Sequence, residues 1–209
     1  STQVVVEIEA IAPSADEDLC AAWSLTDEFD ADSRRWYASS QLPGCAVSVD
    51  QGALVIEQDN VDRCGIESAE HFDLTGSSFA VEVVDAGDCD LAPYLTVLLS
   101  GLYPEIGCVQ SEGAPVLVVQ MFGDGEAPDL LASIPYDSDL HRFWRIRHDG
   151  DGGQLVFETR RDSGEWDDLV STPIDDELVR GAGVALEAAD DSPDGTGEPV
   201  VFDHFNLVP

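Results

Sequence analysis

The stretch HRFWRIRHDGDGGQLVFETRRDSGEW, residues 141–166, decides the fold class. Apolar and polar residues alternate on both sides of HDGDGG, which is the period of two β-strands joined by a hairpin. Four apolar residues share the predicted core face: Trp144, Ile146, Leu155 and Phe157. Because neighbouring side chains of a strand point to opposite faces, four charged residues then share the other face: Arg145, Arg147, Glu158 and Arg160.

The charged face of this hairpin has two interpretations. The chain contains no lysine, and five of its nine arginines lie in this stretch, so the face is a candidate ligand-binding surface. The simpler interpretation is a solvated sheet face, on which cross-strand Arg–Glu pairs contribute only about 0.2–1 kcal/mol each. Trp36 and Tyr37 are further candidate ligand-binding residues, because sugar rings stack on flat aromatic side chains. They are consecutive, so one side chain points inward and the other outward if they lie in a strand.

Short runs with strand character recur along the chain, separated by turn sequences rich in glycine and aspartate. They lie at 4–11, 45–50, 53–57, 79–85, 94–100, 115–122, 141–148, 154–160, 183–189 and 200–207. Helical periodicity is nearly absent, so the sequence predicts an all-β fold built as a two-sheet antiparallel β-sandwich. We expect residues 1–22 to form an N-terminal strand and connector that pack on a main domain of residues 23–209.

The charge balance excludes some partners. The chain has 43 acidic residues and a formal net charge of −34, so it repels phosphate backbones and anionic membrane surfaces. Nucleic acid is therefore not an expected partner. No apolar run reaches the roughly 18 residues that a membrane-spanning helix needs. The chain begins at Ser1 without a signal sequence, as expected of a processed chain.

Five cysteines lie in the first 108 residues, none of them at zinc-ligand spacing. Polar residues flank several of them, which is typical of extracellular disulfides and favours a secreted or cell-surface location. The odd number leaves one thiol over, and spacing alone does not fix the connectivity. We favour Cys89–Cys108 and Cys45–Cys64, each of which would close a strand pair.

Several segments together resemble the concanavalin A-like lectin/glucanase superfamily, especially secreted bacterial modules related to laminin-G-type sandwiches. The resemblance covers roughly residues 24–208. Its motifs are LTDEFD (25–30), GALVIE (52–57), FDLTGSSFAVEVVD (72–85), the hairpin at 141–169 and VVFDHFNL (200–207). It implies a jelly roll of two packed antiparallel sheets, with ligands on the concave face or at loop edges.

The resemblance also implies a recurring calcium site, often structural. Asp203 in VVFDHFNL is the best candidate ligand, because this strand places a carboxylate among apolar residues. Asp27 and Asp30 would assist if the first and last strands are neighbours. Calcium takes six to eight oxygen ligands, which these aspartates and nearby carbonyls would supply. A carboxylate satisfied by hydrogen bonds is the alternative interpretation.

Catalytic motifs are absent from the sequence. The glucanases of this superfamily carry their acid and nucleophile on one strand as E-x-D-x-x-E, and no such string occurs here. The nearest is ESAEHFD (67–73), which alternation would split between two faces, so we interpret it as a solvated edge strand. No nucleophile elbow, zinc-protease motif or phosphate-binding glycine loop is present. We therefore assign no catalytic residue.

These observations favour a non-catalytic extracellular or surface module that binds carbohydrate or a cell-surface protein. Two alternatives remain open. One is a glycoside hydrolase or lyase of the same fold whose carboxylates converge from separate strands. The other is a purely structural surface protein. A concave groove lined by aromatic and polar side chains would support binding.

Overall fold

The computed structural model describes most of the main domain. The described residues of the 209-residue chain are 19–30, 35–38, 44–59, 63–123, 125, 127–190 and 197–207. The predicted strand at 4–11 and the connector that follows it lie outside the described residues. Ala22 is fully buried in the main core, and the predicted domain boundary after this residue stays a prediction.

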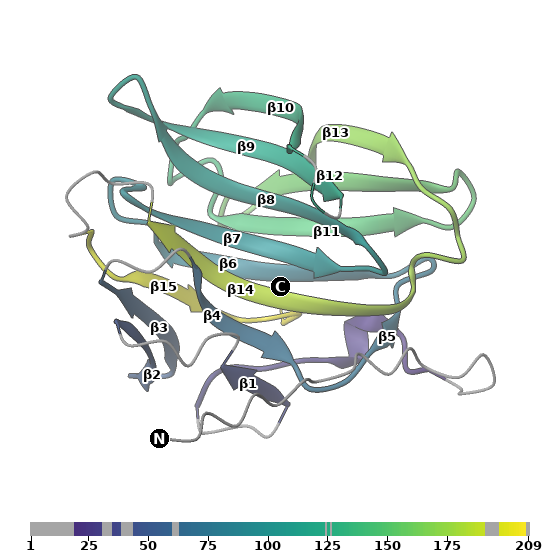
Figure 1. The fold of residues 1–209 in the computed structure, drawn as a ribbon, viewed down its shortest axis with the longest axis horizontal. Coiled ribbons are helices and arrows are strands. Elements are labelled where there is room, and N and C mark those ends of the chain that lie inside the picture. The colour runs from purple at the N-terminus through teal and green to yellow at the C-terminus, as the bar shows by residue number, and fades with distance from the viewer. Residues whose placement is uncertain are drawn as a thin grey trace.

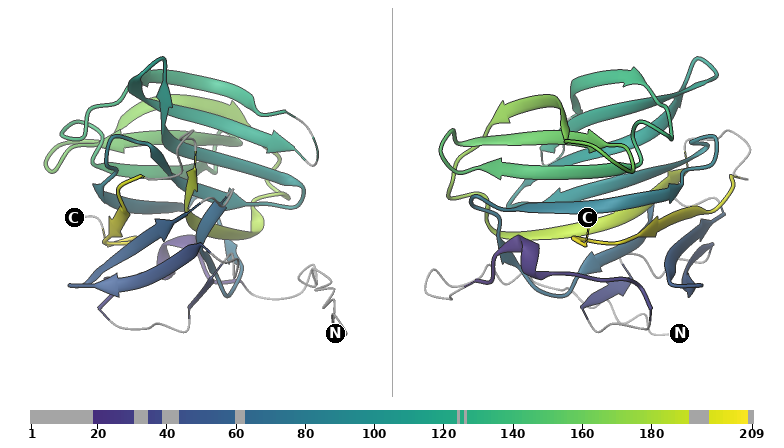
Figure 2. Two further views of the ribbon diagram at one scale, coloured as in Figure 1. Left: turned by 60° about the vertical axis from the view of Figure 1, so that its left-hand side comes forward. Right: turned by 180° about the vertical axis from the view of Figure 1, so that it is seen from behind.

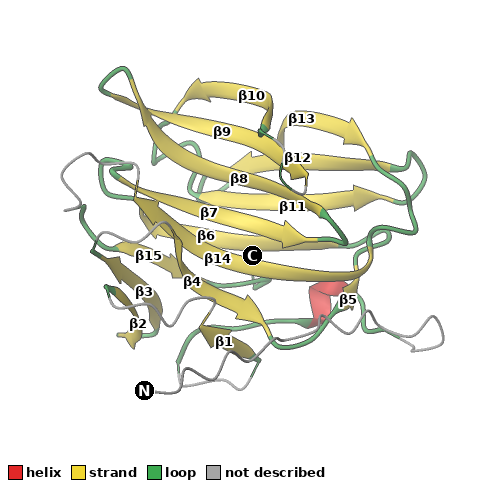
Figure 3. Cartoon of the chain, in the orientation of Figure 1, coloured by secondary structure: helices red, strands yellow, loops and turns green. Residues whose placement is uncertain are grey.

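Two sheets lie face to face, and every pair of named strands is antiparallel (Figures 1 and 2). The first sheet runs in the order β1 (Trp36–Ala38), β4 (Arg63–Ser68), β14 (Arg180–Asp190), β7 (Leu91–Leu98), β8 (Leu102–Ser111), β9 (Ala114–Gly123) and β10 (Asp129–Pro135), with β5 (Phe72–Asp73) beside β14. The second runs in the order β13 (Asp167–Pro173), β12 (Gln154–Arg160), β11 (Phe143–Asp149), β6 (Ser78–Asp85), β15 (Val200–Asp203), β3 (Ala53–Gln58) and β2 (Cys45–Asp50). Within the described residues the only helix is η1 (Ala22–Ser24), drawn in red in Figure 3. The predicted all-β, two-sheet antiparallel sandwich is confirmed.

The core lies between the inner faces of the two sheets. Alternate residues of each strand point into it, as Leu54 and Ile56 do from β3. Burial of each large apolar side chain contributes about 1.5–3 kcal/mol, so this alternation decides which face of each strand turns inward. The intervening residues of each strand point to the outer faces of the two sheets.

The hairpin at 141–166 forms as predicted. β11 pairs with β12 in the register that places Ile146 opposite Phe157 and Arg145 opposite Glu158. Trp144, Ile146, Leu155 and Phe157 are all fully buried in the core. The same strands continue the second sheet, because β11 also pairs with β6 and β12 with β13. The right-hand view of Figure 2 shows the molecule from the opposite side to Figure 1. In that view the sheet that contains β11 and β12 lies nearer the viewer than the other sheet.

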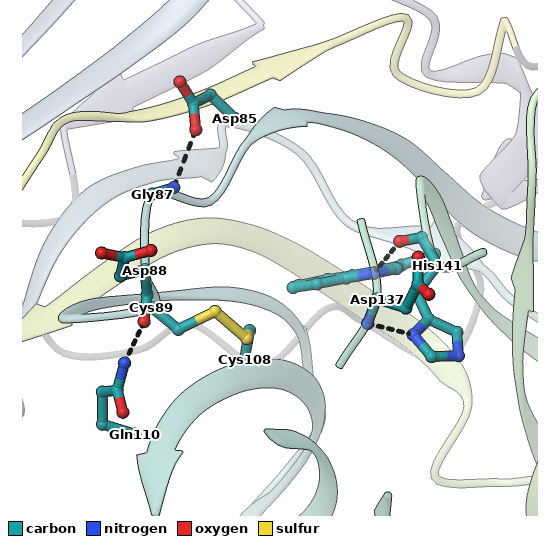
Figure 4. The surroundings of a disulfide bond; sticks show 9 residues. Asp85, Gly87, Asp88, Cys89, Cys108, Gln110, Asp137 and His141 are labelled. Atoms are coloured by element: carbon teal, nitrogen blue, oxygen red, sulfur yellow. Dashed lines mark hydrogen bonds between the residues drawn. A yellow bond between two sulfur atoms is a disulfide. The ribbon is translucent and has the colours of Figure 1, made fainter. Parts of the chain in front are cut away.

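Both predicted disulfides are present. Cys89–Cys108 joins the loop before β7 to the inner face of β8, and beside it Gln110 donates a hydrogen bond to the Asp88 carbonyl (Figure 4). Cys45–Cys64 joins β2 to β4 and so links the two sheets, rather than closing a pair within one sheet as expected. Cys20 is the remaining thiol and is exposed.

None of the helices in the described part of the chain combines the length and the hydrophobicity that a membrane crossing requires.

Candidate functional site

A row of side chains crosses the outer face of the first sheet. Its members are paired from strand to strand in the order Tyr37, Glu67, Ala185, Thr96, Glu105 and Gln120. Their chain neighbours, such as Leu95 and Ile106, point the other way into the core. The row therefore lies on the side of the sheet that faces away from the second sheet.

An arginine holds two carboxylates together on this face. Arg63 Nη2 lies 3.0 and 2.9 Å from the two carboxylate oxygens of Glu105, and Arg63 Nη1 lies 3.0 Å from Glu187 Oε2. These residues come from β4, β8 and β14, so the cluster is built by sheet pairing and not by neighbours in the chain. Burial opposes the charge of Arg63, but the two glutamates outweigh it and raise its pKa. The guanidinium therefore stays charged.

Polar neighbours complete the cluster. Gln120 Nε2 donates to Glu105 Oε1 at 2.7 Å, and Thr96 Oγ1 lies 3.3 Å from Glu105 Oε2 and 3.4 Å from Glu187 Oε2. Glu105 is fully buried, and this burial raises the pKa of its carboxyl group, which Arg63 and Gln120 offset only in part. We call Arg63, Thr96, Glu105, Gln120 and Glu187 the carboxylate–arginine cluster.

Aromatic rings surround the arginine. The Arg63 Cζ atom lies 4.7 Å from the Tyr94 ring centroid and 5.7 Å from the Phe122 centroid, both within cation–π range. Gly107 makes room for Tyr94, since a Cβ atom at this position would approach the ring to 2.2 Å. The rings and the sheet thus hold the guanidinium in place between the two glutamates.

The cluster forms one wall of a hollow of about 360 Å³ on this face. Its lining comes from five strands of the first sheet: Arg63, Thr96, Leu98, Tyr103, Glu105, Phe122 and Glu187. Charged groups therefore meet aromatic rings in one depression. This combination is typical of ligand sites, in which apolar walls surround a few fixed polar groups.

Glu67 lies beside the hollow at the β4 end of the row. Burial, followed by the nearby charge of Glu187, raises the pKa of Glu67. The sequence interpretation of ESAEHFD as a solvated edge strand is wrong here, because β4 lies between β1 and β14 and Glu67 is half-buried. The chain also turns after Ser68, so Glu67 and Asp73 do not share one strand.

The two glutamates of the cluster are engaged by other side chains. A general acid must reach the substrate with a free proton, yet both oxygens of Glu105 are engaged by Arg63 and its side chain is fully buried. Glu187 is more accessible, but its Oε2 atom also contacts Arg63 and Thr96. The cluster is an ordered set of hydrogen-bonding groups rather than a pair of free carboxylates.

The charged residues predicted on the hairpin lie on the outer face of the second sheet, opposite this hollow. Arg145 binds both oxygens of Glu158, at 2.6 and 2.7 Å, and Arg147 Nε lies 3.3 Å from the same carboxylate. The Trp166 ring covers Arg145 and Arg160, with centroid distances of 4.1 and 5.1 Å. The expected solvated face is wrong for Glu158 and Arg160, which are buried. A ligand-binding role for these residues stays a prediction.

The consecutive aromatic residues divide between the two sides of β1, as expected. Trp36 packs against Phe29 and Phe205 and donates from its indole to Asp27 Oδ2 at 2.9 Å, so it belongs to the packing around the core. Tyr37 is about half exposed and faces outward opposite Glu67. Of the two, only Tyr37 lies on the same face as the hollow.

The predicted metal ligands do not come together. Asp203 lies with Glu82 and His204, whose ligand atoms are within 4.8 Å of one another, so this group could hold a metal ion. The backbone of Asp27 forms a β-bridge with Phe205, two residues after Asp203. The Asp27 carboxylate, however, accepts hydrogen bonds from the Trp36 indole and from the Phe29 amide. Asp30 is exposed and, like Asp27, is not in the group.

The Glu82 group also fits calcium poorly. Calcium prefers six to eight oxygen ligands, whereas this group offers two carboxylates and a histidine nitrogen. Glu82 already contacts Arg142 through Oε1 and His204 through Oε2, the latter at 2.7 Å. The Arg142 guanidinium thus already engages one oxygen of the Glu82 carboxylate.

Sequence reasoning missed the three charged residues of the carboxylate–arginine cluster. A usable signal was present for Glu187, which stands among the apolar residues of the predicted strand at 183–189. The argument that singled out Asp203, that a carboxylate in a strand needs a partner, applies equally to Glu187, whereas Glu105 lies in a strand that was not predicted. Their common partner Arg63 was not foreseeable, since it lies 42 and 124 residues away in the chain.

No protein-family model matches the chain, and no curated protein does. Solved structures do match it. One, from work on endo-acting O-glycanases of the human gut microbiota that initiate mucin breakdown, has 13% identity and a TM-score of 0.60 over 88% of this chain and 99% of its own. A β-1,3-1,4-glucanase (lichenase) derived from a mouse hindgut metagenome has 9% identity and a TM-score of 0.53 over 86% and 95%.

The exoplasmic/lumenal domain of VIP36, in a form bound to Ca²⁺ and Man2, has 14% identity and a TM-score of 0.57 over 88% of both chains. Identities this low establish the fold alone. The match to nearly the whole length of each protein agrees with the two-sheet topology of the described residues. The chain therefore has the fold of the concanavalin A-like lectin/glucanase superfamily.

Proposed function

We propose that the chain is a non-catalytic carbohydrate-binding module and that the outer face of its first sheet is the binding surface. The observation that carries this proposal is the hollow in which the carboxylate–arginine cluster meets the rings of Tyr103 and Phe122. Sugars present both hydroxyl groups and apolar ring faces, so a site for them needs fixed acceptors beside flat aromatic surfaces.

The ordered state of the cluster supports binding. Arg63, Thr96 and Gln120 hold the glutamates before any ligand arrives, so little side-chain freedom is lost when a ligand binds. The solved structures of this fold include a lectin domain bound to Man2 and proteins named for glycan cleavage, which is consistent with a glycan as ligand.

An extracytoplasmic location accompanies this proposal. Two disulfides persist in oxidising compartments and are rare in the cytosol, and the resemblance to secreted modules points the same way. Calcium is not part of the proposed binding mechanism, because Asp203 lies on the second sheet, away from the hollow. The calcium site at Asp27, Asp30 and Asp203 stays a prediction.

A glycan array followed by isothermal titration calorimetry with the retained glycans tests the proposal. Tyr103→Ala should weaken binding by about tenfold, because a loss of about 1.4 kcal/mol of contact with the ring corresponds to a factor of ten in affinity. Trp23→Ala is the matched control: Trp23 is 65% exposed and does not line the hollow, so its loss should leave the affinity unchanged. Equal affinities of the two variants would show that the binding surface lies elsewhere. Failure of every glycan on the array to bind would refute the proposal.

The second candidate function is a glycoside hydrolase. One observation favours it: Glu105 and Glu187 converge from separate strands and share the Thr96 hydroxyl. Incubation with a panel of glucans, xylans and O-glycans should release no new reducing ends if the module only binds. Release that Glu187→Gln abolishes would establish the hydrolase instead.

A further inference from the structure

The side chains that line the hollow include two carboxylates and one guanidinium. Among the seven residues that line it, Arg63 is the one cation, facing the carboxylates of Glu105 and Glu187. Glu67, half-buried and close enough to Glu187 to feel its charge, adds a third carboxylate at the margin. The described side chains around the hollow are therefore anionic in balance, within a chain whose net charge is −34.

Arg63 is already committed to partners inside the protein. Its Nη1 atom is bonded to Glu187 and its Nη2 atom to both oxygens of Glu105. The rings of Tyr94 and Phe122 lie against its Cζ atom. An arginine that recognises an acidic ligand normally offers a fork of free donors. Turning Arg63 toward a ligand would leave the fully buried Glu105 without its cation, which is costly.

The carboxylates, by contrast, still offer acceptor capacity. Each ionised carboxylate has about four lone-pair sites. Among the described residues, the hydrogen bonds of the Glu187 carboxylate use only its Oε2 atom, and Glu67 takes part in no ion pair. Acceptors of this kind suit the hydroxyl donors of a neutral sugar. Tyr103 and Phe122 add apolar surface for its ring.

We infer that the hollow selects uncharged, hydroxyl-rich glycans and rejects glycans that carry carboxylate or sulfate groups. The inference rests on the proposed function, since it concerns the same surface. The structural reason is that the one arginine in the lining is engaged by Glu105 and Glu187, so an acidic group entering the hollow meets carboxylates without a cation to pair with. Like-charge contacts of this kind cost several kcal/mol in protein interfaces.

Matched glycan pairs test this inference directly. Each neutral glycan retained on the array is titrated beside its counterpart bearing one uronic acid, sialic acid or sulfate group. We expect the acidic member to bind at least about tenfold more weakly. Equal affinities within the pairs, or binding of the acidic members alone, overturn the inference while the proposed function stands. An absence of binding by every glycan, neutral or acidic, overturns the proposed function itself.

Salt separates the local effect from the overall charge of the chain. The Debye length falls from about 8 Å at 0.15 M to about 3 Å at 1 M ionic strength, so long-range repulsion by the net charge disappears at high salt. Discrimination that persists at 1 M NaCl, and that Glu187→Gln reduces, supports the hollow as its source. If the discrimination between neutral and acidic glycans vanishes at 1 M NaCl, it originates in the net charge of the chain, and the inference is overturned.

Discussion

Gly107 offers a sharp test of how the candidate site is assembled. This residue on β8 lies opposite Tyr94 on β7, on the outer face of the first sheet. A Cβ atom added there would lie 2.2 and 2.4 Å from two carbons of the Tyr94 ring and 2.8 Å from the Pro93 carbonyl oxygen. Carbon atoms pack at about 3.5–4.0 Å, so Gly107→Ala forces the ring to move by more than 1 Å or the strands to separate.

The expected cost is that of overpacking, about 1–3 kcal/mol. For a chain of this size each kcal/mol corresponds to about 2–4 °C in melting temperature. The displaced ring also leaves the Arg63 guanidinium, which Tyr94 contacts at 4.7 Å. We therefore expect Gly107→Ala to lower both the stability and the glycan affinity of the chain.

Thermal and urea unfolding of Gly107→Ala measure the first effect. Gly183→Ala is the matched control: Gly183 is a buried strand glycine of the same sheet, and a Cβ atom there would make only ordinary contacts of 3.4 Å. If Tyr94 causes the clash, Gly107→Ala costs less in a Tyr94→Ala background, which a double-mutant cycle measures. Equal destabilisation by Gly107→Ala and Gly183→Ala would refute the reasoning.

Three further predictions concern the rest of the molecule. Replacing Cys45 and Cys64 together by alanine should lower the free energy of unfolding by about 3 kcal/mol, because the bond closes a loop with a separation of 19 residues; an unchanged urea midpoint contradicts this. Burial raises the pKa of Glu105 and Glu67 above 4.5, so these groups stabilise the fold below that pH and their contribution is lost as pH rises through the folded pKa. Glu67→Gln should therefore flatten the fall in melting temperature with rising pH, and a profile identical to that of the wild type argues against it. Because the Arg142 guanidinium already engages Glu82, EDTA should leave the melting temperature unchanged, whereas a clear decrease would support the calcium prediction.

Local alternation predicted the parts of the fold in which one strand face is clearly apolar. The hairpin of β11 and β12 is the strongest case, and β2 and β12 have the predicted bounds. A one-residue slip in register would turn the apolar face of such a strand toward water, which costs free energy. The residues of the strand therefore specify its own register. The cysteine pairs were also chosen correctly, although the sheets that Cys45–Cys64 links were not foreseen.

Six strands of the described fold lie outside the predicted runs, and in the four longer ones, β4, β8, β10 and β13, their own residues obscure the pattern. β8 contains Pro104, Glu105 and Gly107, and β4 begins with Arg63 and contains Gly65. β10 and β13 are edge strands that begin with aspartate and end with proline, which local rules interpret as turns. Sheet pairing overrides these local preferences, because each strand completes the hydrogen bonds of a neighbour.

The sequence by itself determined the sandwich, its hairpin and the inward residues, because period-two alternation is written into each strand separately. Only the tertiary structure decided the candidate site. Arg63, Glu105 and Glu187 belong to strands β4, β8 and β14, whose order in the sheet differs from their order in the chain. Their contacts depend on that order and on the register of each pair, and both are set by packing of the whole sheet rather than by any single segment.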